Sequence, residues 1–103
     1  MKRRAALYAR TAAWDKSPTQ QLLKLRSFVE HQQWERTEFV DDSVSIEAEG
    51  RPALQALLVA VRKREIDVVV CTAMDRLVAT PQELMALLQE FAEHEVDVEM
   101  LEQ

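Results

Sequence analysis

The sequence predicts an α/β domain, a three-layer sandwich in which a four-stranded, mainly parallel sheet carries helices on both faces. Segments with strand-like patterns alternate with segments of helical periodicity in the order βαβαβαβ, and right-handed crossovers between such strands give parallel pairing. The β-branched and apolar run from Ile66 to Thr72 is typical of a central parallel strand buried on both faces. No linker, repeat or low-complexity tract interrupts this order, so residues 1–103 are expected to form one domain.

Three further segments are predicted to be strands. The first covers Arg4 to Arg10, where side chains alternate between the two faces of the strand. The second covers about Glu35 to Asp41, and the short segment from Val96 to Leu101 closes the chain. With Ile66 to Thr72 these segments make the four strands of the sheet.

Capping signals and apolar stripes predict three helices. The first is expected from about Ser17 to Gln33, with Ser17 as its N-cap, Pro18 in its first position and Gln20 completing a capping box. The second starts at Pro52, and the third opens on the capping box Thr80-Pro81-Gln82-Glu83. Their predicted core stripes are Leu22, Leu25 and Val29; Leu54, Leu57, Leu58 and Val61; and Leu84, Leu87, Leu88 and Phe91.

Composition and charge exclude several classes of protein. The net charge of −5 argues against strong autonomous binding to DNA, because neutralising phosphates requires a basic surface. The single cysteine, Cys71, excludes an internal disulfide, and the isolated His31 and His94 do not make a metal site. Without a secretory signal or an apolar run of about 20 residues, the chain is expected in the cytoplasm, with no membrane, metal or cofactor partner.

The predicted topology brings candidate functional residues to one edge of the sheet. In parallel sheets, ligands bind beyond the carboxyl ends of the strands, and residues 10–15, 42–51 and 73–80 should meet there. These segments hold the candidate site residues Arg10, Arg51, Asp75 and Arg76.

Three guanidiniums near helix N-termini would bind phosphate or another anion, and a neighbouring carboxylate would orient one of them or transfer a proton. A set of structural ion pairs is the alternative that spacing alone leaves open.

Several short motifs occur in the order, and with nearly the spacing, of one known family. They are Tyr8-Ala9-Arg10, Gln21, Asp42 with Ser45, Gly50-Arg51-Pro52-Ala53-Leu54 and Met74-Asp75-Arg76-Leu77. In these motifs the chain resembles the amino-terminal catalytic domain of the serine recombinases, the resolvase/invertase family. The similarity covers essentially the whole chain.

The resemblance implies a fold and a chemistry. Members of this family cut DNA by attack of a serine hydroxyl on the phosphodiester, and an arginine cluster stabilises the charge that develops at phosphorus. The resemblance assigns catalytic positions to Arg10, Arg51, Asp75 and Arg76. It assigns anion binding to Arg10, Gln21, Ser45, Arg51 and Arg76. It also implies a dimerisation helix and a DNA-reading domain after the last strand, and neither is expected within residues 1–103.

The departures from the family pattern bear on activity. Ala12 stands where the family has its nucleophilic serine, and Ala79 stands where it has the last arginine of its Asp-Arg-Leu-Gly-Arg motif. Ile46 and Lys16 replace a glycine of the mobile loop and a second glutamine. A methyl group cannot attack phosphorus, and loss of one preorganised donor alone costs about 10²–10³ in rate.

These observations lead to one hypothesis and two alternatives. The hypothesis is a catalytically inactive recombinase-like domain, linked to DNA recombination or mobile elements. Such a domain would act through contacts with DNA, which it binds weakly alone, with a recombinase or with a second copy of itself. The alternatives are an active strand-exchange enzyme that uses another hydroxyl, and a small module that binds anions or nucleotides.

Overall fold

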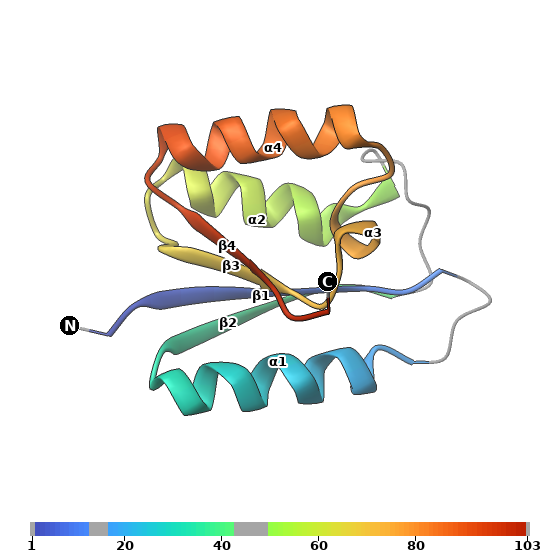
Figure 1. Cartoon of the computed structure of the whole chain (residues 1–103), viewed down its shortest axis with the longest axis vertical. Helices are drawn as coiled ribbons and strands as arrows, with labels where there is room; N and C mark the ends of the chain where they lie inside the picture. Colours follow the sequence, from blue (N-terminus) through green and yellow to red (C-terminus); the bar gives the residue numbers. More distant parts are fainter. Residues whose placement is uncertain (1, 13–16, 43–49, 103) are drawn as a thin grey trace.

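The computed structural model describes residues 2–12, 17–42 and 50–102. In these residues each of the first three strands is followed by a helix, and two helices separate β3 from β4 (Figure 1). Their bounds are β1 Arg4–Arg10, α1 Thr19–Gln32, β2 Glu35–Asp41, α2 Pro52–Arg62, β3 Val68–Cys71, α3 Met74–Leu77, α4 Pro81–Glu93 and β4 Asp97–Met100.

The sheet has the strand order β2-β1-β3-β4, and every described pairing is parallel. Helix α1 covers one face, whereas α2 and α4 lie over the other (Figure 1). The three-layer α/β sandwich is therefore confirmed. Strands β1 and β2 have the predicted bounds, while β3 and β4 are shorter than predicted at both ends.

Two apolar clusters hold the layers together. The cluster between the sheet and α2 is the larger, and it includes Tyr8, Leu57, Val69 and Phe91. The cluster beneath α1 includes Leu7, Leu25, Val29, Val68 and Val70. All four residues of β3 are buried, as expected of a central strand. No helix in the described part of the chain is long and apolar enough to cross a membrane.

The start of α1 differs from the prediction. Pro18 takes the N-cap position and no side chain caps the helix, because the Ser17 hydroxyl donates instead to the Thr19 hydroxyl at 3.0 Å. The start of α4 agrees better, since the Thr80 hydroxyl accepts a hydrogen bond from the Glu83 amide at 3.2 Å. The Glu83 carboxylate reaches one residue further back than in a regular capping box, to the amide of Ala79.

The predicted core stripe of α4 is confirmed at three of its four positions and is wrong at Leu88. Phe91 is buried and Leu84 and Leu87 are half-buried against the main core cluster, whereas Leu88 is 39% exposed. The physical reason is the position of α4 at the margin of the sheet, where β4 is the last strand of the described residues. Helix α3 was not predicted, because its four residues are too few to show helical periodicity.

The two serine/threonine positions give a matched test of the capping assignment. Thr80→Ala should lower the free energy of unfolding by about 1 kcal/mol, since the Glu83 amide loses its acceptor. Ser17→Ala should change it by less than about 0.5 kcal/mol, since Ser17 caps nothing. Urea denaturation followed by circular dichroism measures both values, and equal losses would contradict the assignment.

Candidate active site

The three segments predicted to meet at the carboxyl edge of the sheet are in contact there. Arg10 at the end of β1 donates from Nη2 to the carbonyl oxygen of Asp75 at 3.0 Å. Arg76 of α3 returns a bond from Nη1 to the Arg10 carbonyl at 3.1 Å, and Arg51 donates from Nη2 to the Arg76 carbonyl at 2.7 Å. The three arginines therefore form one cluster that is tied together through backbone carbonyls.

Arg10 lies at the centre of this cluster and is only 8% exposed. The side-chain amide of Gln21 fixes its backbone on both sides, with Nε2 bonded to the Arg10 carbonyl at 2.9 Å and Oε1 accepting from the Arg10 amide at 3.2 Å. Gln21 therefore positions Arg10 from α1.

The charge on Arg10 is poorly compensated. Burial lowers the pKa of its guanidinium, and the positive charges of Arg51 and Arg76 lower this pKa further. Within the described part of the chain, the Arg10 Nε atom is buried and has no hydrogen-bond partner. A buried donor on a cation that other cations surround is the arrangement that an anion would stabilise.

Arg51 is 1% exposed and points into the core rather than out of the site. Its Nε and Nη2 atoms donate to the Tyr8 hydroxyl at 3.0 and 2.9 Å. The Tyr8 hydroxyl in turn donates to Asp41 Oδ2 at 2.6 Å. Burial, and then the hydrogen bond to Asp41, raise the pKa of Tyr8, so this side chain stays neutral. Its hydroxyl links the Asp41 carboxylate to the Arg51 guanidinium through hydrogen bonds.

Asp41, the last residue of β2, is the second partner in this network. Its carboxylate accepts the backbone amides of Ala53 and Leu54 at 2.8 and 3.0 Å, and thereby caps the N-terminus of α2 from another element. Sequence reasoning named Tyr8 and Asp42 only as parts of family motifs and assigned no site role to Asp41 or Tyr8. The available signal was the strand pattern, since Asp41 pairs with Arg10 across β1 and β2.

The remaining predicted residues lie at the mouth of the cluster or beyond it. The Asp75 side chain is 74% exposed, and its Oδ1 atom lies 4.0 Å from Arg76 Nε. Ala79 is exposed just before α4. Ser45, Ile46 and Lys16 fall outside the described residues.

The position expected to hold the nucleophile carries only a methyl group. Ala12 is buried two residues beyond β1. The neighbouring Thr11 is also buried, and its hydroxyl donates to Asp42 Oδ1 at 2.6 Å. Burial raises the pKa of Cys71 to about 12, so its thiol is not ionised near neutral pH. Among the described residues, no group of three or more His, Cys, Asp and Glu side chains could hold a metal ion.

A family model, "Resolvase, N terminal domain", matches residues 5–103. No curated protein sequence matches the chain. Among solved structures, the chain is similar to the N-terminal catalytic domain of TP901-1 integrase, with 23% identity over 96% of this chain and 77% of the other and a TM-score of 0.86.

Two transposon-related structures are also similar. The C-terminal catalytic domain of ISC1926 TnpA, an IS607-like serine recombinase, shares 25% identity over 97% of this chain and 70% of the other, with a TM-score of 0.83. The product of the first open reading frame in transposon ISC1904 from Sulfolobus solfataricus P2 shares 23% identity over 96% of this chain and 67% of the other, with a TM-score of 0.78.

The Asp41–Tyr8–Arg51 network should dominate the stability of this edge. Asp41→Ala is expected to lower the free energy of unfolding by about 3–5 kcal/mol, because it leaves Arg51 as a buried charge with a weakened partner and removes two amide acceptors. Asp75→Ala is the matched control, with an expected change of less than about 0.5 kcal/mol since its side chain is exposed. Chemical denaturation checks both, and an Asp41→Ala loss no larger than the control would refute the role of the network.

Proposed function

Since the chain belongs to the resolvase family of serine recombinases, we propose that it is a non-cleaving recombinase domain that binds the DNA phosphate backbone at its arginine cluster. In this proposal the domain takes part in recombination or transposition through contacts with DNA and with a partner protein. It does not break the phosphodiester.

The observation that carries the proposal is the buried Arg10 Nε donor at the centre of the cluster. Arg51 and Arg76 already donate to backbone carbonyls, so their positions are fixed before a ligand arrives. A phosphate oxygen at Arg10 would accept a hydrogen bond from Arg10 Nε, and its negative charge would offset the repulsion among the three arginines. The proposal thus assigns anion binding to Arg10 first, with Arg76 at the more exposed side.

The absence of cleavage follows from the residue at position 12. The family reaction needs an oxygen nucleophile next to the cluster, and Ala12 supplies none. The Thr11 hydroxyl is buried and engaged with Asp42, and Thr80 is the cap of α4. The loss of an arginine at Ala79 would further weaken stabilisation of the charge on phosphorus.

The acidic balance of the chain supports a need for a partner. A net charge of −5 opposes long-range attraction to DNA, so the cluster alone gives weak binding that salt screens. A partner that holds the domain on DNA would raise the local concentration of phosphate and compensate for this weakness.

Fluorescence anisotropy of a labelled generic duplex tests the binding half of the proposal. We expect salt-sensitive binding at low ionic strength, weakened about tenfold by Arg10→Gln because a charge-assisted bond to phosphate is lost. The matched control is Arg36→Gln on exposed β2, which should leave the affinity unchanged. Equal affinities of the two variants would exclude the cluster as the DNA site, and competition by a free nucleotide as strong as by duplex would favour the small-ligand alternative.

Incubation with supercoiled plasmid, followed by a denaturing gel, tests the absence of cleavage. We expect no covalent protein–DNA adduct from the wild-type chain, because Ala12 has no hydroxyl and the hydroxyls of Thr11 and Thr80 are already engaged. An active serine recombinase run on the same gel serves as the positive control. A wild-type adduct would establish the active-enzyme alternative, and comparison with Ala12→Ser would then show whether position 12 matters.

A further inference from the structure

A cavity of about 280 Å³ lies between α2 and α4, beside the end of α3. Its apolar walls come from α2, from the end of α3 and from α4, and they are Leu54, Leu58, Leu77, Val78, Ala86 and Leu87. Every described residue that lines the cavity lies between positions 51 and 90, so its walls are internal elements of the fold.

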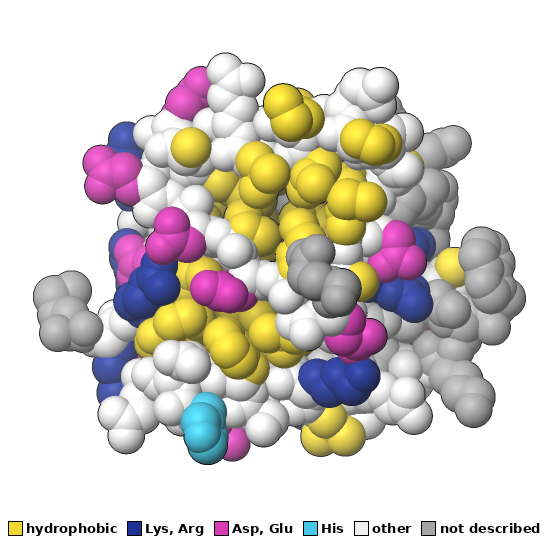
Figure 2. All heavy atoms as spheres, in the orientation of Figure 1, with side chains coloured by type: hydrophobic (Ala, Val, Ile, Leu, Met, Phe, Trp, Pro, Cys, Tyr) yellow, Lys and Arg dark blue, Asp and Glu magenta, His cyan; other side chains and the backbone are white. Residues whose placement is uncertain are grey.

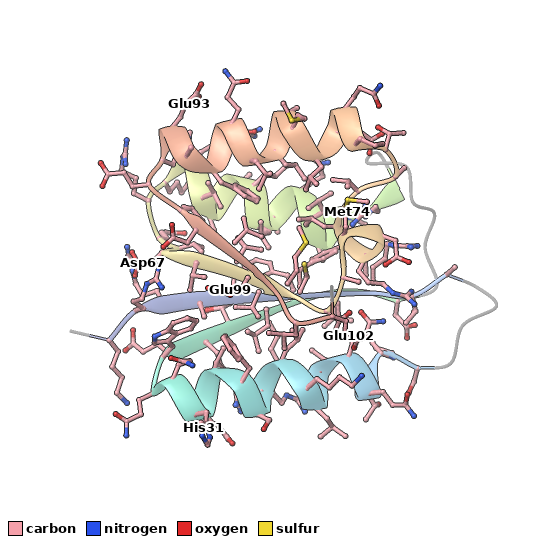
Figure 3. All side chains as sticks on the ribbon, in the orientation of Figure 1. His31, Asp67, Met74, Glu93, Glu99 and Glu102 are labelled. Atoms are coloured by element: carbon pink, nitrogen blue, oxygen red, sulfur yellow. The ribbon has the colours of Figure 1, made fainter. Side chains whose placement is uncertain are left out.

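The cavity belongs to the apolar layer that joins these helices to the sheet. Leu54, Leu58 and Leu77 are members of the main core cluster, and Leu87 packs against it. Figure 2 shows apolar side chains of this layer in yellow between α4 and the sheet, and Figure 3 shows side chains of the helices and the sheet meeting there. A ligand in the cavity would therefore contact side chains that the fold already holds in place.

The size of the cavity indicates the size of its ligand. An apolar cavity of about 150 Å³ is large enough for a benzene ring. At about 280 Å³, the cavity between α2 and α4 has room for a bicyclic ring of the size of indole. It is too small for a partner helix, which needs a groove that takes side chains from successive turns. A small molecule is therefore the occupant that fits.

Two carboxylates of α4 border the cavity and differ in how their charge is balanced. Glu90 Oε1 pairs with Arg62 Nε at 2.5 Å, so its charge already has a partner. Glu83 Oε2 accepts only the backbone amide of Ala79, at 3.0 Å, and no cation of the described residues pairs with it. The mouth of the cavity thus offers one carboxylate that a cation on the ligand can approach.

The arginine in the wall of the cavity does not reverse this preference. Arg51 Nε and Nη2 donate to the Tyr8 hydroxyl, and Nη2 also donates to the Arg76 carbonyl. Its charge is balanced by the Asp41 carboxylate through the Tyr8 hydroxyl. The charges around the cavity therefore favour a cationic ligand over an anionic one.

We propose that the cavity binds an arylalkylamine, a small molecule that joins a flat apolar ring to an ammonium group. The ring lies among Leu54, Leu77 and Leu87, and the ammonium group reaches the Glu83 carboxylate at the mouth. Burial of the ring supplies most of the affinity, while the carboxylate selects the charge. This binding requires neither DNA nor the proposed function.

Three molecules that share the indole ring and differ in charge test the proposal. Tryptamine, indole and indole-3-propionate are titrated separately into the full chain without DNA, and the leucine methyl signals are followed by nuclear magnetic resonance. We expect saturable shifts at Leu54, Leu58, Leu77 and Leu87. Tryptamine should bind about threefold more tightly than indole, and indole-3-propionate more weakly than indole, because an ion pair at an exposed mouth adds a modest attraction.

Matched variants of α4 separate the roles of charge and ring. Glu83→Gln should abolish the preference for tryptamine and leave the affinity for indole unchanged. Glu93→Gln, at an exposed position that Figure 3 labels at the far end of α4, should change neither affinity. Ala86→Phe places a ring in the cavity from an exposed position, so it should weaken binding of both molecules about tenfold or more while circular dichroism stays native.

Several results would overturn the proposal. Methyl shifts outside the cavity, wild-type affinity in Ala86→Phe, or no saturation by tryptamine would exclude the cavity as the site. An unchanged preference for tryptamine in Glu83→Gln would remove the role of the carboxylate. Dimerisation of the chain that Ala86→Phe abolishes, seen by analytical ultracentrifugation, would assign the cavity to a second copy instead. Because the titrations contain no DNA, their failure is distinguishable from failure of the duplex experiment.

Discussion

The structure depends on a short chain of buried hydrogen bonds from Asp41 through Tyr8 to Arg51. This network joins the end of β2, the middle of β1 and the start of α2, and Arg51 extends it to the backbone of α3. A buried guanidinium is costly unless its charge is balanced, and the carboxylate balances it through a neutral tyrosine. The same carboxylate caps α2. The same side chain thus contributes both to the position of one helix and to the neutralisation of one cation.

The site inherits its geometry from this network. Because Arg51 holds the Arg76 carbonyl, α3 is fixed against the sheet, and Arg76 can then bond to the Arg10 carbonyl. Gln21 fixes the same stretch of backbone from the other layer. The donor left over is Arg10 Nε, on the residue at which the contacts from β1, α1 and α3 converge. The anion site proposed above would therefore follow from the way in which the layers are joined.

Much of this arrangement was accessible from the sequence, and the rest was not for definite physical reasons. The apolar runs within Arg4–Arg10 and around Val68–Cys71 identify strands, because a short strand that is buried on both faces of a sheet is apolar at nearly every position. The partners of Arg51 could not be predicted from such patterns. Its contact with Tyr8, which lies 43 residues away in the sequence, depends on the strand register and on the order of the layers. The exposure of Leu88 on α4 could not be predicted either, because periodicity identifies an apolar face but not the element that covers it.

The positions that the resemblance assigns to the family site differ in what they contribute to the fold. Arg51 and Gln21 serve the fold directly, one as a buried tie to Tyr8 and the other as a bridge from α1 to β1, so replacing them carries a stability cost whether or not the domain cuts DNA. Positions 12 and 79 contribute no polar side chain, since both are alanine. Alanine fits the buried space after β1, and Ala79 contributes only a backbone amide to the start of α4. In the non-cleaving domain proposed above, alanine at positions 12 and 79 would therefore cost the fold little, whereas replacement of Arg51 would remove a buried tie to Tyr8.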